Sequence, residues 1–228
     1  LHDALPIFDN LYIEITATTD EHTAVVRIEN AHTNITYVSI DGNVISETIN
    51  EIKEAESSTC PMTFDSIYEF AKAGDISGIL PSIKQQVEYN TAISNEGLSN
   101  DYGANIGRLL LLDDETPSLE TKCKARAAAG SDARMSGCPL PVVICSGSGN
   151  QGLTVSMPII TTAEELGKTD DELYRALVFA NLLTLYVKSG IGKLSAYCGV
   201  VSAGIVSVAG IAFLKGDSKD IIEDTLVN

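Results

Sequence analysis

Residues 140–152 read LPVVICSGSGNQG, an apolar run that leads into a loop with three glycines. Four side chains of this loop can form hydrogen bonds, namely those of Ser146, Ser148, Asn150 and Gln151. Polar loops between apolar runs usually bind something, and backbone N–H groups beside short hydroxyl and amide side chains suit a carboxylate. We therefore predict that the loop binds the carboxylate of a small molecule such as an amino acid. The structural alternative is a glycine-rich turn that needs positive φ.

The same loop matches the GxGxxG pattern of dinucleotide-binding proteins, and Asp170 and Asp171 lie about 20 residues downstream. In that motif the last glycine opens a helix, whereas residues 153–158, LTVSMP, contain β-branched side chains and end in proline. We therefore disfavour a nucleotide site. A nucleotide-binding oxidoreductase would require a helix that starts between Gly149 and Gly152, and one of the two aspartates at the end of the next strand.

Two charged residues precede the loop in the segment AAAGSDARM, residues 127–135. Asp132 and Arg134 can position the amine and the carboxylate of a substrate, or they can simply form an ion pair with each other. The Ala-rich residues 119–129 before them, preceded by Pro117-Ser118, predict a helix.

Downstream, Thr169 and Glu172 have the spacing of a capping box and predict a helix that ends at Gly190. One face of this helix is apolar and is expected to face the core: Leu173, Leu177, Ala180, Leu183 and Val187. Residues 196–214 contain no charged side chain, which raises a transmembrane alternative. Because the segment holds Cys198, two serines and three glycines and lacks an aromatic belt, we favour a buried central helix.

The first part of the chain has a different periodicity. Between residues 11 and 48 apolar side chains alternate with polar ones, with Asp41-Gly42 as a turn signal, which predicts a small antiparallel meander over residues 11–60. From Thr63 onward the patterns are mostly helical. The expected architecture is therefore α+β, with a small antiparallel β subdomain and a mainly helical core over residues 61–228.

Both ends of the chain look cut. Residues 1–10, LHDALPIFDN, fit no pattern that joins to the alternating residues after them, and we interpret them as a non-native or unstructured start. Residues 220–228 form an amphipathic helical pattern without a terminating glycine or proline. These patterns indicate a fragment that is truncated at both ends.

The composition restricts the partners. The formal net charge is −16, which repels phosphate backbones, so we expect no nucleic acid as partner, and no membrane. The chain has no CxxC pair and an odd number of cysteines, which predicts a reducing cytoplasm with free or metal-bound thiols. The five cysteines are Cys60, Cys123, Cys138, Cys145 and Cys198. A lone cysteine in an apolar run usually only packs, so composition alone makes none of them a ligand.

Three segments together carry a resemblance: AAAGSDARMSG at 127–137, LPVVICSGSGNQGLTVSMPI at 140–159 and KLSAYCGVVSAG at 193–204. They resemble the core of the L-cysteine desulfidase family, which is related to the serine dehydratase alpha chain. The segment HTNI at 32–35, before the Asp-Gly turn, is similar to the β segment of that family. The resemblance runs over residues 11–228. The chain departs from the family after Gly204, where it reads IVSVAG.

The resemblance implies a four-iron four-sulfur cluster held by three cysteines, with one iron open to substrate as a Lewis acid. The implied reaction is that of a carbon–sulfur lyase, which converts L-cysteine and water to pyruvate, ammonia and sulfide. Cys198 matches the middle cluster ligand of the family, and the other two belong to segments that this chain does not contain. The other four cysteines are not at ligand motifs, so the isolated fragment is expected to be inactive.

Two alternatives stay open at this point. An L-serine dehydratase would use a similar mechanism and differ in the atom that leaves the β-carbon, and a non-catalytic amino-acid-binding module would keep the loop without the cluster. The sequence identifies no general base. It also leaves the oligomeric state open, with a homo-oligomer among the expectations.

Overall fold

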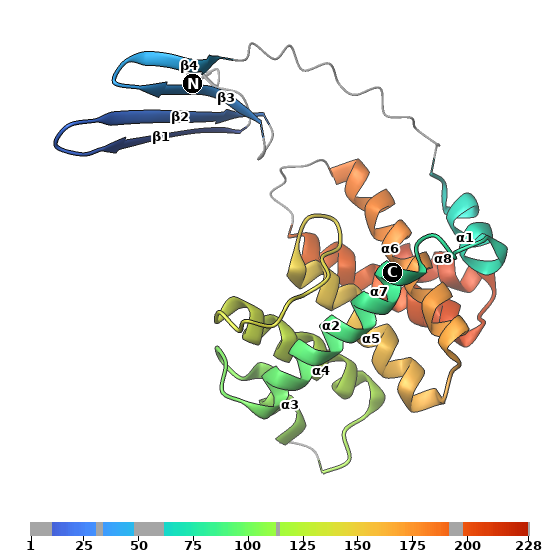
Figure 1. The fold of residues 1–228 in the computed structure, drawn as a ribbon. Helices are drawn as coiled ribbons and strands as arrows, with labels where there is room; N and C mark the ends of the chain where they lie inside the picture. The colour runs from blue at the N-terminus through green and yellow to red at the C-terminus, as the bar shows by residue number, and fades with distance from the viewer. Residues whose placement is uncertain (1–10, 31–33, 48–61, 113–114, 192–197, 228) are drawn as a thin grey trace, which may run out of the picture. The chain divides into compact units, whose positions relative to one another are not determined.

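The computed structural model describes residues 11–30, 34–47, 62–112, 115–191 and 198–227 (Figure 1). The chain divides into two compact units, residues 1–60 and 61–228. The first unit holds an antiparallel sheet and the second is helical, which confirms the α+β class. The expected non-native start at residues 1–10 lies outside the described residues.

The first unit is a four-stranded meander with the strand order β1-β2-β3-β4. Its strands are β1 (Tyr12–Thr18), β2 (Thr23–Glu29), β3 (Ile35–Ile40) and β4 (Asn43–Glu47). Asp41 and Gly42 connect the last two strands with φ values of 52° and 78°. A two-residue hairpin turn of type I′ needs positive φ at both positions, and Asp-Gly is a pair that tolerates it. The predicted turn is therefore confirmed.

The second unit contains all the helices of the described residues (Figure 1). They are α1 (Phe64–Ala73), α2 (Leu80–Ser99), α3 (Ile106–Leu112), α4 (Leu119–Met135), α5 (Gly149–Leu166), α6 (Asp170–Ile191), α7 (Gly199–Lys215) and α8 (Lys219–Val227). Among these helices, none is long and apolar enough to cross a membrane.

The central helix of this unit is α5, which contacts α2, α4, α6 and α7. Leu153, Val155, Met157 and Ile159 are each 0% exposed. The expected central helix, α7, instead leaves one face open, where Val201, Ile205 and Val208 are 62%, 43% and 51% exposed. This is a correction: a run without charges predicts apolar surroundings on all sides, but the contacts of α7 cover only part of its circumference.

Helix α5 also corrects the expectation that residues 153–158 are not helical. Pro158 lies inside the helix, where it cannot donate the usual backbone hydrogen bond. Its carbonyl oxygen accepts hydrogen bonds from the Thr162 hydroxyl at 2.8 Å and from the Cys123 thiol at 3.4 Å. Burial of nearly every apolar side chain of α5 outweighs the weak helix propensity of its sequence.

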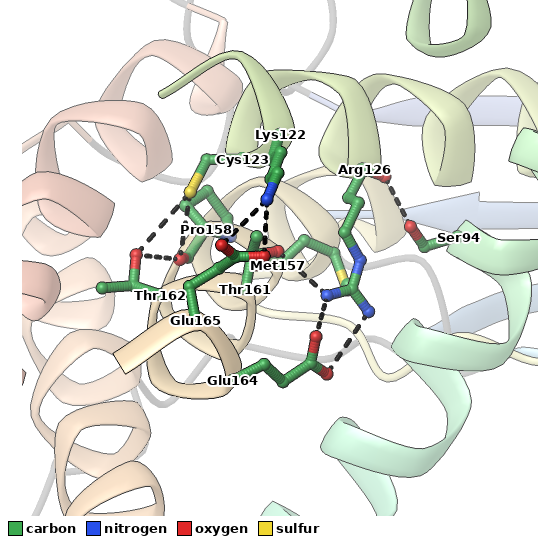
Figure 2. Close-up of polar contacts among 10 residues, drawn as sticks. All are labelled: Ser94, Lys122, Cys123, Arg126, Met157, Pro158, Thr161, Thr162, Glu164 and Glu165. Atoms are coloured by element: carbon green, nitrogen blue, oxygen red, sulfur yellow. Dashed lines mark hydrogen bonds and ion pairs between the residues drawn. The ribbon is translucent and has the colours of Figure 1, made fainter. Parts of the chain in front are cut away.

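Polar contacts join α4 to α5 (Figure 2). Arg126 donates to the Thr161 hydroxyl at 3.2 Å and pairs with Glu164, and Lys122 pairs with Glu165 at 2.8 Å. Cys123 also contacts the Thr162 hydroxyl, 3.6 Å away. Cys123 is 7% exposed and contacts Pro158 and Thr162, so it is part of the interface between α4 and α5. Burial raises the pKa of its thiol.

Helix α2 carries a row of buried polar side chains. Gln86, Asn90 and Ser94 are 2%, 0% and 0% exposed and follow one another at intervals of four residues. The Gln86 and Asn181 side-chain amides exchange two hydrogen bonds, at 3.2 and 2.8 Å, which join α2 to α6. The Ser94 hydroxyl donates to the carbonyl oxygen of Arg126 at 2.8 Å, which joins α2 to α4. Each residue of this row therefore binds a different part of the unit.

The predicted capping box at the start of α6 is confirmed. Glu172 accepts the Thr169 backbone N–H at 2.9 Å, and the Glu172 N–H donates to the Thr169 hydroxyl at 3.3 Å. Lys168 adds an ion pair to Glu172 at 2.9 Å. The Thr169 N–H, Lys168 and the Thr169 hydroxyl together lower the pKa of Glu172 to about 2.

Replacement of this carboxylate gives a pH-dependent result. The folded pKa of Glu172 lies below its usual value, so its stabilising contribution is present near pH 7 and is lost as the pH falls towards about 2. We expect Glu172→Gln to lower the thermal midpoint at pH 7 and to change it much less at pH 2. Melting curves at both pH values, followed by circular dichroism, test this, with Glu88→Gln on the exposed side of α2 as the control. An equal decrease of the thermal midpoint at both pH values would contradict a stabilising role of the ionised Glu172 carboxylate.

Candidate functional site

The glycine-rich loop begins with a tight turn over residues 145–148. The N–H of Cys145 donates to the carbonyl oxygen of Ser148 and the N–H of Ser148 to that of Cys145, both at 3.2 Å. Ser146 and Gly147 occupy the corner with φ values of 54° and 89°. The expected turn with positive φ is present, and a non-glycine residue takes one of its two strained positions.

The two other glycines allow close approach of the backbone. A Cβ atom on Gly149 would lie 2.3 Å from Nε of Arg134. A Cβ atom on Gly152 would lie 2.1 Å from the carbonyl oxygen of Val143. Close packing therefore requires glycine at positions 149 and 152, and a positive φ favours it at position 147.

The loop ends where the N-termini of two helices meet. Helix α5 begins at Gly149 after Ser148, and α7 begins at Gly199 after Cys198, and neither N-cap residue makes a side-chain capping bond. A Cβ atom on Gly199 would lie 2.3 Å from Nε2 of Gln151, so the first turn of α5 lies directly against the start of α7. The free N–H groups and the dipoles of both helices favour an anion at such a place.

Two buried polar atoms at this junction have no hydrogen-bond partner among the described residues. They are Oε1 of Gln151 and Oγ of Ser146. Gln151 is only 8% exposed. A buried acceptor without a donor is costly and rare in folded proteins. An ammonium group could satisfy the Gln151 oxygen, and the Ser146 hydroxyl could donate to a carboxylate.

Of the predicted site residues, Arg134 and Asn150 are brought together, because Nη1 of Arg134 donates to Oδ1 of Asn150 at 3.1 Å. Ser148 is half-buried at the N-cap of α5. Asp132 lies elsewhere: its Oδ2 accepts the backbone N–H of Ile106 at 2.9 Å, at the start of α3. The expected ion pair between Asp132 and Arg134 is therefore corrected. The Asp132 carboxylate instead accepts a hydrogen bond at the N-terminus of α3, where the helix dipole favours a negative charge.

The thiols of the helical unit differ in accessibility. Cys198 is exposed, Cys138 is half-buried, and Cys123 and Cys145 are buried. Burial raises the pKa of the Cys145 thiol to about 11. Cys60 lies outside the described residues. Cys198, exposed at the N-terminus of α7, suits a metal-bound thiolate, and the described residues contain no group of three metal-ligating side chains. The described residues by themselves therefore do not form a complete metal site.

The thiols should differ in reactivity accordingly. At pH 8 we expect Cys198 to react with iodoacetamide before Cys138. Cys145 should react only as the pH approaches its pKa of about 11, or after unfolding. Mass spectrometry of peptides after timed labelling gives the order. Fast labelling of Cys145 in the native chain at pH 8 would contradict its burial, and urea-unfolded chain is the positive control.

The dinucleotide-binding alternative meets only one of its two requirements. A helix does start at Gly149, contrary to our expectation. Asp170 and Asp171, however, lie in the first turn of α6, where Asp171 pairs with Arg175 at 2.9 Å. Within the described residues all strands lie between residues 12 and 47, so the strand–helix–strand unit of a dinucleotide site is absent.

The sequence did not reveal two features of this site. One is the contact of Gln151 with Gly199, which joins segments about fifty residues apart in the chain, and for such pairs a single sequence carries no distance signal. The other is Asn90, which lies beneath the loop. Polar residues at the spacing of Gln86, Asn90 and Ser94 usually form a solvated helix face, whereas here all three side chains are buried.

The fold and the site thus define an α+β protein whose helical unit presents two uncapped helix N-termini, a buried unpartnered amide oxygen and an accessible thiol. This chain belongs to the serine dehydratase alpha chain family, whose model matches residues 21–228. The finding confirms the broader family that the sequence motifs indicated. No solved structure matches the chain.

Curated relatives agree with this membership. A UPF0597 protein of Desulfitobacterium hafniense is 45% identical over 231 residues, which cover 100% of this chain and 53% of the relative. UPF0597 proteins of Lachnoclostridium phytofermentans and Finegoldia magna are 43% and 44% identical over 223 residues, which cover 96% of this chain and 53% of each relative. The chain thus spans about half the length of these relatives.

Proposed function

We propose that the chain forms part of the amino-acid-binding site of an iron–sulfur-dependent lyase that converts L-cysteine and water to pyruvate, ammonia and sulfide. The observation that carries the proposal is the buried, unpartnered Oε1 of Gln151 at the junction of α5 and α7, next to the exposed Cys198. Membership in the serine dehydratase alpha chain family supports a lyase.

The residues at the junction match the two charged groups of an amino acid. The free N–H groups at the start of α5 and the Ser146 hydroxyl would hold the carboxylate. The Gln151 oxygen would accept a hydrogen bond from the ammonium group. Asn150, which is held by Arg134, and Ser148 line the same end of the helix. Together these groups would fix the orientation of the substrate before any bond breaks.

Cys198 is the residue that we assign to the cluster. A cluster with an open iron would supply a Lewis acid for the sulfur that leaves the β-carbon. The remaining ligands would have to come from outside the described residues, since these contain no group of three metal-ligating side chains. The reaction removes one proton from the α-carbon and the thiol group from the β-carbon. Water then replaces the nitrogen, so that pyruvate, ammonia and sulfide balance L-cysteine and water.

The test uses a protein of the relatives' full length that contains this chain, purified without oxygen. Sulfide and pyruvate are measured from L-cysteine, with L-serine in parallel, and the visible absorbance of the cluster is recorded on the same sample. Sulfide and pyruvate in equal amounts from L-cysteine support the proposal. Pyruvate from L-serine alone would replace it with a serine dehydratase, and a protein with neither cluster nor turnover would reject lyase activity.

A further inference from the structure

We propose that Asn90 of α2 is a positioning residue that holds the glycine-rich loop in the shape needed to bind an amino-acid substrate. Its effect on the loop follows from contacts within the helical unit. Its effect on substrate binding rests on the proposed function. Two experiments, one on the loop and one on turnover, separate these effects.

The side-chain amide of Asn90 forms hydrogen bonds with both backbone polar groups of Val143. Its Oδ1 accepts the Val143 N–H at 2.8 Å, and its Nδ2 donates to the Val143 carbonyl oxygen at 3.3 Å. Asn90 is 0% exposed, so loss of its side chain would leave the N–H and the carbonyl oxygen of Val143 without this buried partner, which costs stability. A side chain that pairs with both polar groups of one residue must carry a donor and an acceptor side by side, as an amide does.

The same amide also binds the helix that follows the loop. Nδ2 of Asn90 donates to the Ser156 hydroxyl at 3.0 Å, and this hydroxyl donates to the carbonyl oxygen of Gly152 at 2.7 Å. Gly152 in turn lies against the carbonyl oxygen of Val143. One side chain therefore joins the segment before the tight turn to the first turn of α5, where Asn150 and Gln151 lie.

A matched control lies one helical turn away. Gln86 is on the same helix, is buried to a similar degree and also uses its amide in two hydrogen bonds. Its partner is Asn181 of α6, so Gln86 does not contact the loop. Loss of either amide should lower the stability of the unit, but only loss of Asn90 should free the loop.

The first experiment measures hydrogen–deuterium exchange of the peptide that covers residues 141–153 in the 228-residue chain. In Asn90→Ala we expect exchange in this peptide to be about tenfold faster than in the unmodified chain, because its buried anchor is lost. In Gln86→Ala we expect exchange there to stay within about twofold. Ser156→Ala removes the Ser156 hydroxyl, and with it both the bond from Nδ2 of Asn90 and the link to Gly152, while the two bonds to Val143 remain. It gives a second, milder variant if Asn90→Ala does not fold. Equal exchange in the Asn90 and Gln86 variants, or an unchanged loop in Ser156→Ala, overturns the inference.

The second experiment measures turnover in the full-length protein. We expect Asn90→Ala to raise KM for the amino acid by about tenfold, with kcat much less affected and the cluster absorbance unchanged. Gln86→Ala should leave KM unchanged. A loss of kcat at unchanged KM would contradict positioning of a binding loop. If the unmodified protein acts on neither amino acid, the proposed function fails, while the exchange experiment still decides whether Asn90 positions the loop.

Discussion

Gly152→Ala is expected to destabilise the helical unit by about 3 kcal/mol, the upper part of the range for overpacked cores. The new Cβ atom would lie 2.1 Å from the carbonyl oxygen of Val143 and 3.1 Å from the backbone nitrogen of Cys145. Both are backbone atoms, so no side-chain rotation relieves the contact. The loop must therefore move away from α5, which breaks its pairing with Asn90. Urea unfolding followed by circular dichroism at 222 nm measures the loss.

Gly190→Ala is the matched control for this substitution. Gly190 lies in α6, its φ is not positive, and a Cβ atom there would have no atom within 4 Å. Alanine at a helical position without strain should stabilise the chain by up to about 1 kcal/mol. If Gly152→Ala unfolds at the same urea concentration as the unmodified chain, then the loop is not packed on α5 as the structure has it.

Cys198→Ala is expected to abolish both the visible cluster absorbance and the release of sulfide in the full-length protein. The thiol is exposed at the N-cap of α7 and makes no side-chain capping bond, so its loss should change the free energy of unfolding by less than about 0.5 kcal/mol. Loss of the cluster absorbance in a protein that keeps its fold is the result expected for a cluster ligand. Iron and sulfide analysis, absorbance and the sulfide assay are made on one anaerobic preparation.

Cys138→Ala provides the control for the cysteine substitution. Cys138 is half-buried, follows the C-terminal end of α4 and contacts Tyr102, so its removal should leave the cluster and turnover in place. A Cys198→Ala protein that keeps its cluster absorbance would remove Cys198 from the ligand set. A Cys198→Ala protein that keeps the cluster and loses only turnover would instead make the thiol part of the substrate site.

The sequence predicted those features that depend on neighbours in the chain. The alternation of residues 11–48 and the Asp41-Gly42 pair predicted the meander, and both are present. Thr169 and Glu172 predicted the start of α6. The predicted apolar face of α6 is buried at Leu173, Leu177, Ala180 and Leu183. These features are local, because caps, turns and periodicity act within a few residues.

Sequence-based expectations were wrong where long-range packing outweighs local preference. Pro158 and its β-branched neighbours argued against a helix, yet burial on several sides makes α5 the central helix. The charge-free segment that becomes α7 was expected to be buried, and one of its faces is exposed. Asp132 and Arg134 are close in sequence but bind different partners, because residues two positions apart on a helix point in nearly opposite directions: Asp132 binds Ile106 and Arg134 binds Asn150.

The family, the α+β class, the glycine-rich loop and the cysteine chosen for a functional test all come from the sequence. Motif similarity and hydrophobic period are properties of the chain, so they can be read without coordinates. Only the folded chain shows that Gln151 contacts the start of α7 and that Asn90 forms hydrogen bonds with the segment before the loop. Both depend on pairs far apart in sequence, whose contact is set by how the helices pack and by the need to pair every buried polar group.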